Sequence, residues 1–412
     1  MKSIFTSLSP NTQADDIILS VARIFLPWSY VRGPAPRILE QDFSRRLGVR
    51  HAFSFDSGRT SLLSILTCMN LAKGDEVLVQ ALTCVAVPDP ILWAGLVPVY
   101  VDCDEKTFTM SSEDFKRKIT PKSKAVVIQH TFGQPAKMDE LIAIARKNNL
   151  LIIEDCAHAL GATHNNRKVG TFGDASFFSF GRDKVISSVF GGVVATDNDT
   201  LAERLEDFQK RSLYPSRLWV FRQLMHPIVL YKAKLTYDLF KLGRIILEAA
   251  KQMRIVSLAV EAEEKMGRRP SFVGHKLPNA LAILALHQLK KLNGFNEHRK
   301  KIAGVYDAEL SKMDNITPAR ERGSSHIFLR YSILSDKKSN VMNAAKRERI
   351  YLGDWYSQPV APKGVDYERV RYRMGSCPNA EETAEKIINL PTDIHISESD
   401  AKRVVRLIQK HL

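Results

Sequence analysis

Two short apolar runs, residues 150–153 and 175–180, are rich in strand-forming residues, and each leads into side chains that could take part in catalysis. These side chains are Asp155, His158, Ser179 and Lys184. In open α/β sheets, ligands bind beyond the carboxyl ends of the strands. We therefore expect the four residues to meet at one edge of a sheet, beside a bound small molecule.

The chemistry of these side chains suits pyridoxal phosphate. The amine of Lys184 can form a Schiff base with the cofactor aldehyde and then hand the aldehyde to an amino substrate. An ionised Asp155 would favour the protonated ring nitrogen, the form in which the ring withdraws electrons best. The Ser179 hydroxyl could donate to the phosphate. Each residue type is common by itself, and it is the ordered set that indicates this cofactor.

The segments around these residues, EDCAHALGA at 154–162 and SFGRDK at 179–184, resemble the DegT/StrS family of sugar aminotransferases, which are fold-type I pyridoxal phosphate enzymes. The resemblance implies that Lys184 is the Schiff-base lysine, that Asp155 pairs with the ring nitrogen and that His158 packs beside the ring. Some relatives are dehydratases in which histidine replaces the lysine, and Lys184 argues against that subgroup.

A second motif lies between a predicted strand, 52–55, and a predicted apolar helix, 62–71. Free backbone N–H groups and the helix dipole make such a helix start an anion site. In the family, the matching segment holds the cofactor phosphate, and here it consists of Ser57, Gly58, Arg59 and Thr60. Arg59 stands where threonine is common, which would change side-chain contacts but leave the backbone contacts unaltered.

Two further positions depart from the family pattern. Cys84 takes the place of an aromatic residue that often stacks on the cofactor ring, so we expect neighbouring apolar groups to help cover the ring. Gly274 and Lys276 occupy the places of an Asn and an Arg that reach the neighbouring subunit's cofactor phosphate. Lys276 could still supply charge as a point donor, though without a planar fork. The resemblance also implies a homodimer, the commonest closed oligomer.

The chain has 412 residues, with 60 basic and 45 acidic side chains and a net charge of +15. This charge suits phosphorylated substrates, an anionic membrane surface or nucleic acid. The basic residues are spread along the chain and form no nucleic-acid motif, so we expect no nucleic-acid partner. Five cysteines without metal-ligand spacing indicate reduced thiols. With no signal peptide and no long apolar window, the sequence indicates a cytoplasmic protein.

The alternation of predicted strands and helices indicates an α/β fold with a mainly parallel sheet. Together with the resemblance, it predicts a three-layer pyridoxal phosphate domain of the aspartate aminotransferase type and a smaller α+β C-terminal domain. We divide the chain into an N-terminal helical arm (1–50), a large cofactor-binding domain (51–212), an insertion (213–268) and a small C-terminal domain (269–412). In the last part we expect a helix over 278–310, a strand over 326–334 and a helix over 380–388.

The insertion 213–268 is the part least like the family. It is basic and apolar, and Pro227 should break or kink any helix there. Aromatic and aliphatic residues beside basic ones are typical of a helix lying in a membrane interface. They are Leu218, Trp219, Val220, Phe221, Ile228, Val229, Leu230, Tyr231, Leu239, Phe240, Ile245 and Ile246, with Arg217, Arg222, Lys232, Lys234, Lys241, Arg244, Lys251 and Arg254. We expect contact with an anionic membrane on its inner, cytoplasmic face. Packing on a partner subunit and covering the active site are the alternatives.

Two functions fit the sequence. The first is an aminotransferase that moves an amino group, commonly from glutamate in the family, to a keto-sugar nucleotide, as in the biosynthesis of cell-surface polysaccharides and related glycans. The second is a non-catalytic relative, a membrane-associated regulator or scaffold that keeps the fold. The departures at Cys84, Phe190, Gly274 and Lys276 keep the second function open. The sugar, the aminated carbon and the nucleotide are not specified by any motif.

Overall fold

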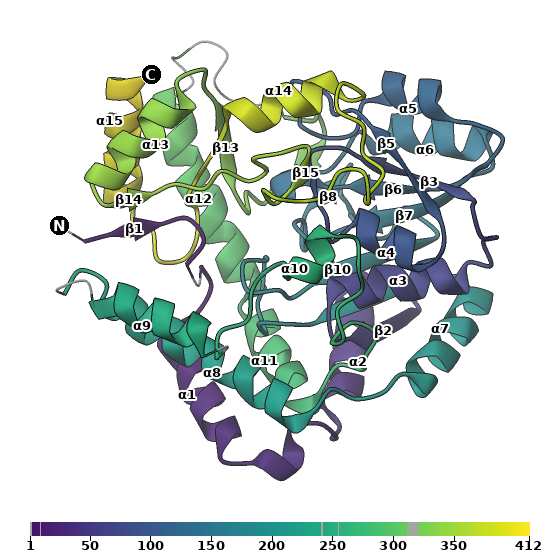
Figure 1. Cartoon of the computed structure of the whole chain (residues 1–412), viewed down its shortest axis with the longest axis horizontal. Coiled ribbons are helices and arrows are strands. Elements are labelled where there is room, and N and C mark those ends of the chain that lie inside the picture. Colours follow the sequence, from purple (N-terminus) through teal and green to yellow (C-terminus); the bar gives the residue numbers. More distant parts are fainter. Residues whose placement is uncertain (1, 9, 240–241, 254, 311–312, 314–319) are drawn as a thin grey trace.

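The computed structural model describes residues 2–8, 10–239, 242–253, 255–310, 313 and 320–412. A seven-stranded sheet forms its centre, with the strand order β2-β11-β10-β7-β6-β3-β5 (Figure 1). The strands are β2 (His51–Phe55), β3 (Glu76–Gln80), β5 (Val97–Val101), β6 (Ser123–Gln129), β7 (Leu151–Asp155), β10 (Ala175–Ser179) and β11 (Gly192–Thr196). Only β11 is antiparallel to its neighbours, β2 and β10. The predicted mainly parallel α/β sheet is confirmed.

Helices cover both faces of this sheet, because apolar residues on successive positions of a strand point to opposite sides. Val77 and Val79 face one cluster, whereas Leu78 faces another. The first face packs against α3 (Gly58–Cys68), α4 (Pro88–Trp93) and α7 (Asp199–Arg211). The second packs against α2 (Ala35–Leu47), α5 (Ser112–Lys118), α6 (Met138–Lys147) and α11 (Asn279–Lys290). The result is the expected three-layer domain.

The smaller domain gathers around a separate apolar cluster. It contains α12 (Leu292–Leu310), α13 (Lys338–Arg347), α14 (Pro378–Lys386), α15 (Glu398–His411) and the antiparallel strands β13 (Tyr331–Leu334) and β16 (Ile387–Leu390). The N-terminal strand β1 (Ile4–Phe5) also belongs to it, because β1 pairs in parallel with β14 (Ile350–Tyr351) (Figure 1). The sequence pattern gives no sign of this last pairing.

Several predicted elements have different bounds in the structure. The single helix expected over 278–310 is two helices that meet at Lys291. The strand expected over 326–334 is limited to β13, and the helix expected over 380–388 ends at Lys386, where β16 takes over. The sequence does not mark a break of one residue in a helix. It also does not mark a helix that passes directly into a strand, so neither feature can be predicted from the pattern of residues.

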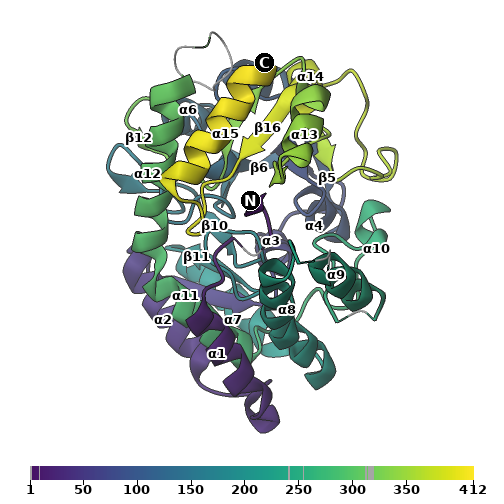
Figure 2. The same cartoon turned by 90° about the vertical axis from the view of Figure 1, so that its left-hand side faces the viewer.

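The insertion forms α8 (Arg217–Leu235), α9 (Leu242–Gln252) and the short α10 (Ala262–Lys265). Of the break or kink expected at Pro227, the break is wrong, because α8 continues through this residue. Proline removes one backbone hydrogen bond, but Val220 and Leu224 in the same helix are buried against the second face of the sheet domain. This packing offsets the loss. In both views α8 lies beside α1 (Ala14–Ile24) and α9 (Figures 1 and 2).

The apolar residues predicted to face a membrane differ in exposure, and Trp219, Val229, Tyr231 and Ile246 are half-buried. Val220, Ile228 and Leu230 are buried in the protein, so they are unavailable to a membrane. A second group is exposed and includes Leu218, Phe221, Leu239 and Ile245. Phe240, Lys241, Arg254 and the side chain of Lys251 lie outside the described residues. Of the described helices, none is long and apolar enough to span a membrane.

Candidate active site

A cavity lies beyond the carboxyl ends of β7 and β10, between the large sheet and a loop of the smaller domain. Eight of the ten residues predicted for the site line it: Ser57, Gly58, Arg59, Cys84, Asp155, His158, Ser179 and Lys184. Thr60 and Lys276 are the two that do not line it. The sheet therefore brings the two sequence motifs, which are about a hundred residues apart, to one place.

Lys184 and His158 are in direct contact in this cavity. The Nζ atom of Lys184 lies 2.8 Å from Nε2 of His158. Burial, followed by the charges of Lys184 and Arg330, lowers the pKa of His158 well below its usual range. The imidazole is therefore neutral at physiological pH. Its ring forms a cluster with those of Phe132 and Tyr356, in which the three centroids are 5.5 to 6.1 Å from one another.

Asp155 ends β7 and is buried beside these two residues. Its Oδ1 atom accepts a hydrogen bond of 2.9 Å from the N–H of Ala157. Burial raises the pKa of Asp155, while this hydrogen bond and the charge of Lys184 act in the opposite direction. A cationic group bound in the cavity would favour the carboxylate form further. Asp155 thus has the properties that a partner of a protonated ring nitrogen needs.

The start of α3 forms the phosphate end of the cavity. Ser57 caps the helix, with its hydroxyl accepting a hydrogen bond from the N–H of Thr60. The N–H groups of Gly58 and Arg59 belong to the first turn, where a helix offers no carbonyl partner. Gly58 is required there, because a Cβ atom at this position would lie 2.9 Å from Cβ of Ser179. The backbone at the start of α3 and the hydroxyl of Ser179 can therefore face the same anion.

Thr60 supports this turn from behind. Its hydroxyl donates to Asp56 Oδ1 at 2.5 Å and accepts from the N–H of Gly274 at 2.9 Å. Asp56 also accepts hydrogen bonds from Ser57 and from the N–H of His275. Both the hydroxyl and the carboxylate are thus used to hold residues 274–275 against the start of α3. Thr60 itself does not line the cavity, and its predicted part in holding the cofactor phosphate remains a prediction.

Lys276 lies on a different side of the turn. Its Nζ donates to the carbonyl of Lys210 at 2.9 Å and stands 5.2 Å from the ring centroid of Tyr214. The side chain therefore points away from the cavity of its own chain. Its predicted role, toward the cofactor phosphate of a neighbouring subunit, remains a prediction.

A loop of the smaller domain closes the cavity opposite the sheet. Strand β15 (Val360–Ala361) pairs in parallel with β4 (Thr83–Cys84), and this pairing brings Trp355 and Tyr356 beside Cys84. Lys184 Nζ lies 5.5 Å from the Trp355 ring centroid. Nothing in the sequence of residues 351–362 indicates a contact with Cys84. These two rings are apolar groups beside Cys84, and their covering of a bound cofactor ring remains a prediction.

The segment 257–264, at the end of the insertion, forms another wall, in which Ala259 and Val260 line the cavity. Two arginines hold this segment. Arg59 contacts the carbonyl of Ala259, and its Nε lies 2.6 Å from Oε1 of the fully buried Glu264. The alternative in which the insertion covers the candidate active site therefore applies to these residues. Sequence reasoning missed the wall because it had no signal linking Arg59 to a carboxylate some two hundred positions away.

Arg182 is the second arginine that binds the wall. It contacts the carbonyl of Ser257, and its Nη2 donates to Ser257 Oγ at 3.1 Å and to the carbonyl of Leu258 at 2.7 Å. Arg182 lies between Ser179 and Lys184 in sequence and lines the cavity itself. Its position within the lysine motif was visible in the sequence, but its partners were not.

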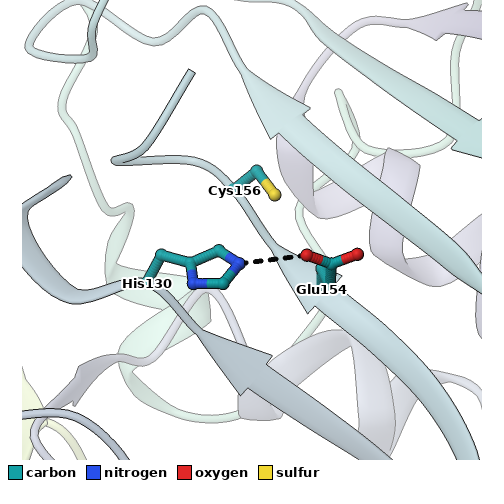
Figure 3. Close-up of side chains that lie close together, drawn as sticks. All are labelled: His130, Glu154 and Cys156. Carbon is teal, nitrogen blue, oxygen red and sulfur yellow. Dashed lines mark hydrogen bonds and ion pairs between the residues drawn. The ribbon is translucent and has the colours of Figure 1, made fainter. Parts of the chain in front are cut away.

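Behind the cavity, His130, Glu154 and Cys156 lie close together (Figure 3). His130 Nδ1 accepts from the N–H of Ala136, so Nε2 carries the hydrogen and donates to Glu154 at 3.2 Å. Glu154 also accepts from three backbone N–H groups, those of Gly170, Phe172 and Gly173. These bonds satisfy the imidazole and the carboxylate. The group therefore has a structural role.

The residues around the cavity fit pyridoxal phosphate. Lys184 offers the amine, Asp155 the buried carboxylate, and the start of α3 the anion site. At Gly181, a Cβ atom would meet Cγ of Lys184 at 3.3 Å, so glycine leaves the lysine room to move. When bound, the cofactor supplies an electron-withdrawing ring that stabilises negative charge on a substrate carbon.

Comparison with known proteins agrees with this site. The model of the DegT/DnrJ/EryC1/StrS aminotransferase family matches residues 13–409. The chain is 27% identical to the UDP-N-acetyl-3-dehydro-alpha-D-glucosamine 3-aminotransferase of Acidithiobacillus ferrooxidans, over 97% of this chain and 94% of that protein. It is 28% identical to the GDP-perosamine synthase of Caulobacter vibrioides, with 90% and 89% covered.

Among solved structures, the aminotransferase TlmJ from Streptoalloteichus hindustanus has the same fold. The two superpose with a TM-score of 0.76 at 23% identity, over all of this chain and 98% of that one. The fold, the cavity and the matched family agree with one another. The chain therefore belongs to the DegT/DnrJ/EryC1/StrS aminotransferase family and is a pyridoxal phosphate-dependent aminotransferase.

Proposed function

We propose that the protein transfers an amino group from glutamate to a keto-sugar nucleotide for cell-surface polysaccharide or related glycan biosynthesis in the cytoplasm. The observation that carries this proposal is the contact of Lys184 with His158 in a cavity that also contains Asp155. The relatives named above act on nucleotide sugars, as their names state. The non-catalytic alternative is disfavoured, because the side chains that catalysis needs are all present together.

Each residue has a distinct task in this reaction. Lys184 holds the cofactor covalently and, once released, moves a proton at the substrate carbon. His158 orients the lysine amine and keeps one side of the cavity apolar and flat. Asp155 keeps the ring nitrogen protonated. The wall of residues 257–264 and the Trp355–Tyr356 loop limit access of water, which strengthens the electrostatic interactions inside.

Absorbance spectroscopy tests the proposal in two steps. The purified protein, loaded with pyridoxal phosphate, should be yellow and should lose its visible band on addition of glutamate. A panel of keto-sugar nucleotides should then restore the band and give an amino sugar detectable by mass spectrometry. Glutamate's amide, glutamine, serves as a second donor for comparison. A protein that stays colourless after loading, or one that no donor converts, would overturn the proposal.

We also propose a homodimer in which Lys276 of each subunit contributes positive charge to its partner's phosphate site. This is supported by the direction of the side chain, away from its own cavity. Sedimentation of the wild type and of Lys276→Ala, each at several concentrations, tests the dimer. The affinity for pyridoxal phosphate tests the contribution of the lysine. An active monomer with unchanged cofactor affinity in the variant would refute this arrangement.

The exposed part of the insertion favours a further contact, with an anionic membrane surface. Leu218, Phe221 and Ile245 are exposed on α8 and α9, together with the basic Arg217 and Arg244. Apolar side chains beside cations suit the headgroup region. Flotation with anionic and neutral liposomes at low salt tests this contact, with Leu218→Ser/Ile245→Ser as the comparison. Wild-type protein that remains at the bottom with anionic liposomes would show that these residues have another role.

A further inference from the structure

Three cationic side chains line the cavity, and two of them have a clear purpose within the proposed function. Lys184 holds the cofactor, and Arg59 is paired with the buried carboxylate of Glu264. The third, Arg182, differs from both. Its hydrogen bonds all go to neutral oxygen atoms, and no ion pair between described residues includes it. No carboxylate among the described residues is in direct contact with it, although the charge of the adjacent Asp183 favours its cationic form.

The surroundings of Arg182 are built to hold the guanidinium still. Ser257 Oγ accepts from it and donates in turn to the buried Gln223 of α8 at 3.0 Å. The ring of Phe190 lies 5.5 Å below the guanidinium carbon. Burial lowers the pKa of Arg182 to about 10, so the side chain remains charged near neutral pH. A mostly buried cation with no carboxylate in direct contact costs free energy, and an anion bound beside it would lower that cost.

We propose that Arg182 binds an oxyanion of a molecule held in this cavity, and that the segment Ser257–Leu258 fixes its guanidinium for that purpose. This inference rests on the proposed function. The oxyanion has two sources, the phosphate of the cofactor and a carboxylate of the amino donor. A planar guanidinium suits both, because it can offer two parallel N–H groups to a pair of oxygens.

The proposal also accounts for the insertion. The residues that orient Arg182 come from α8 and from the segment that follows α9, and both belong to 213–268. The insertion therefore supplies the support, while the lysine motif supplies the charge. In this arrangement the chain itself places a cation at the cavity, although Lys276 points away from it.

The test uses Arg182→Gln, with Arg217→Gln on the exposed surface of α8 as the matched control. Fluorescence titration gives the dissociation constants of pyridoxal phosphate and of pyridoxal, which has no phosphate. If the oxyanion is the phosphate, Arg182→Gln raises the dissociation constant of pyridoxal phosphate about tenfold or more and leaves that of pyridoxal unchanged. If it is the donor carboxylate, both constants stay the same, and the glutamate concentration for half-maximal loss of the visible band rises by a similar factor.

Unchanged values in both titrations, in a variant that melts like the wild type, would overturn the inference. If Arg182→Gln does not fold, Arg182→Lys decides the question, because lysine keeps the charge but loses the planar fork. Arg182→Lys should weaken the binding of the same ligand by a smaller factor. An affinity equal to that of the wild type for every ligand would again overturn the inference. The outcome is separable from the proposed function. Wild-type protein that binds no pyridoxal phosphate contradicts that function, whereas wild-type binding with an unaffected variant contradicts only the role of Arg182.

Discussion

Nε2 of His158 and Nζ of Lys184 are 2.8 Å apart, and the hydrogen bonds around the ring indicate which atom is the donor. His158 Nδ1 accepts a hydrogen bond of 3.4 Å from the N–H of Phe132. A backbone N–H can only donate, so Nδ1 carries no hydrogen and Nε2 carries one in the neutral ring. Nε2 can then donate to the free-amine form of Nζ, which is the form that attacks an aldehyde.

We expect His158→Phe to keep the cofactor but to lower turnover about 10- to 100-fold. Phenylalanine retains a flat ring beside Phe132 and Tyr356 but has no nitrogen to orient the lysine amine, and a hydrogen bond to such a group is worth about 1.5–3 kcal/mol. Steady-state rates and cofactor titration measure the two effects separately. His158→Ala is the comparison, and it should lose cofactor affinity as well. Full activity in His158→Phe would mean that the ring is needed only for packing.

Lys184→Ala should abolish covalent attachment of the cofactor and leave the fold intact. Gly181 leaves space around this lysine, and its side chain contributes little to the core, so the melting temperature should stay close to that of the wild type. Borohydride reduction followed by mass spectrometry of tryptic peptides measures the attachment. The exposed Lys346→Ala on α13 is the control and should be labelled at Lys184 like the wild type. A reduced cofactor adduct on the Lys184→Ala protein would disprove the assignment.

Asp155→Asn should bind pyridoxal phosphate and lose most of its turnover. The amide cannot stabilise a cationic ring nitrogen by charge, and the loss of a charged hydrogen bond corresponds to roughly a 10- to 150-fold lower rate. Single-turnover absorbance measurements with glutamate separate this effect from product release. Near-normal rates would show that Asp155 has a structural role at the end of β7.

Glu264→Gln should destabilise the protein, because it leaves the guanidinium of Arg59 without its buried partner. Breaking a buried ion pair from one side costs about 3–5 kcal/mol. The double variant Arg59→Met/Glu264→Gln removes both charges and should recover part of this loss. Urea unfolding of the wild type, the two single variants and the double variant provides a double-mutant cycle for this pair. If the effects of the single variants simply add, the pair does not hold the wall in place.

Asp89, in α4, is fully buried, and neither of its carboxylate oxygens has a hydrogen-bond partner among the described residues. Burial, with the charge of Glu264, raises the pKa of Asp89 to about 9. The folded protein therefore keeps a proton that the unfolded chain releases above about pH 4. The contribution of Asp89 to the free energy of unfolding is therefore fully present below that pH, and it declines as the pH rises to about 9.

The corresponding variant, Asp89→Asn, cannot lose a proton. Its unfolding free energy should therefore improve relative to that of the wild type as the pH is raised from 5 to 9, whatever the size of the difference at pH 5. Urea unfolding at several pH values measures this trend, with the exposed Asp354→Asn as the control. A constant difference between variant and wild type across the range would show that Asp89 is ionised in the folded state.

Sequence reasoning identified the parts of the site that come from short continuous segments. The pair of motifs around Asp155 and Lys184 and the start of α3 near Ser57 each have a local pattern, and the sheet order that unites them follows from strand and helix alternation. The structure brings these residues into one cavity. Their catalytic roles follow from family membership and remain open to the tests above.

The parts that sequence reasoning missed depend on contacts between distant segments. Arg182 meets Ser257, Arg59 meets Glu264, and Cys84 meets Tyr356 through the β4–β15 pairing, with no local signal in either member of each pair. Pro227 shows the opposite error, where a strong local rule gave the wrong result. Burial of the α8 helix outweighs the hydrogen bond that proline removes.

The pairing of β1 with β14 affects the order in which the chain is assembled during synthesis. Ile4 lies opposite Ile350 in this pair. At a synthesis rate of about 5–20 residues per second, roughly 20–70 s pass before the partner strand has been made. Throughout that time Ile4 and Phe5 lack the strand with which they pair. A segment translated before the whole sheet domain thus reaches its final place only after that domain is complete.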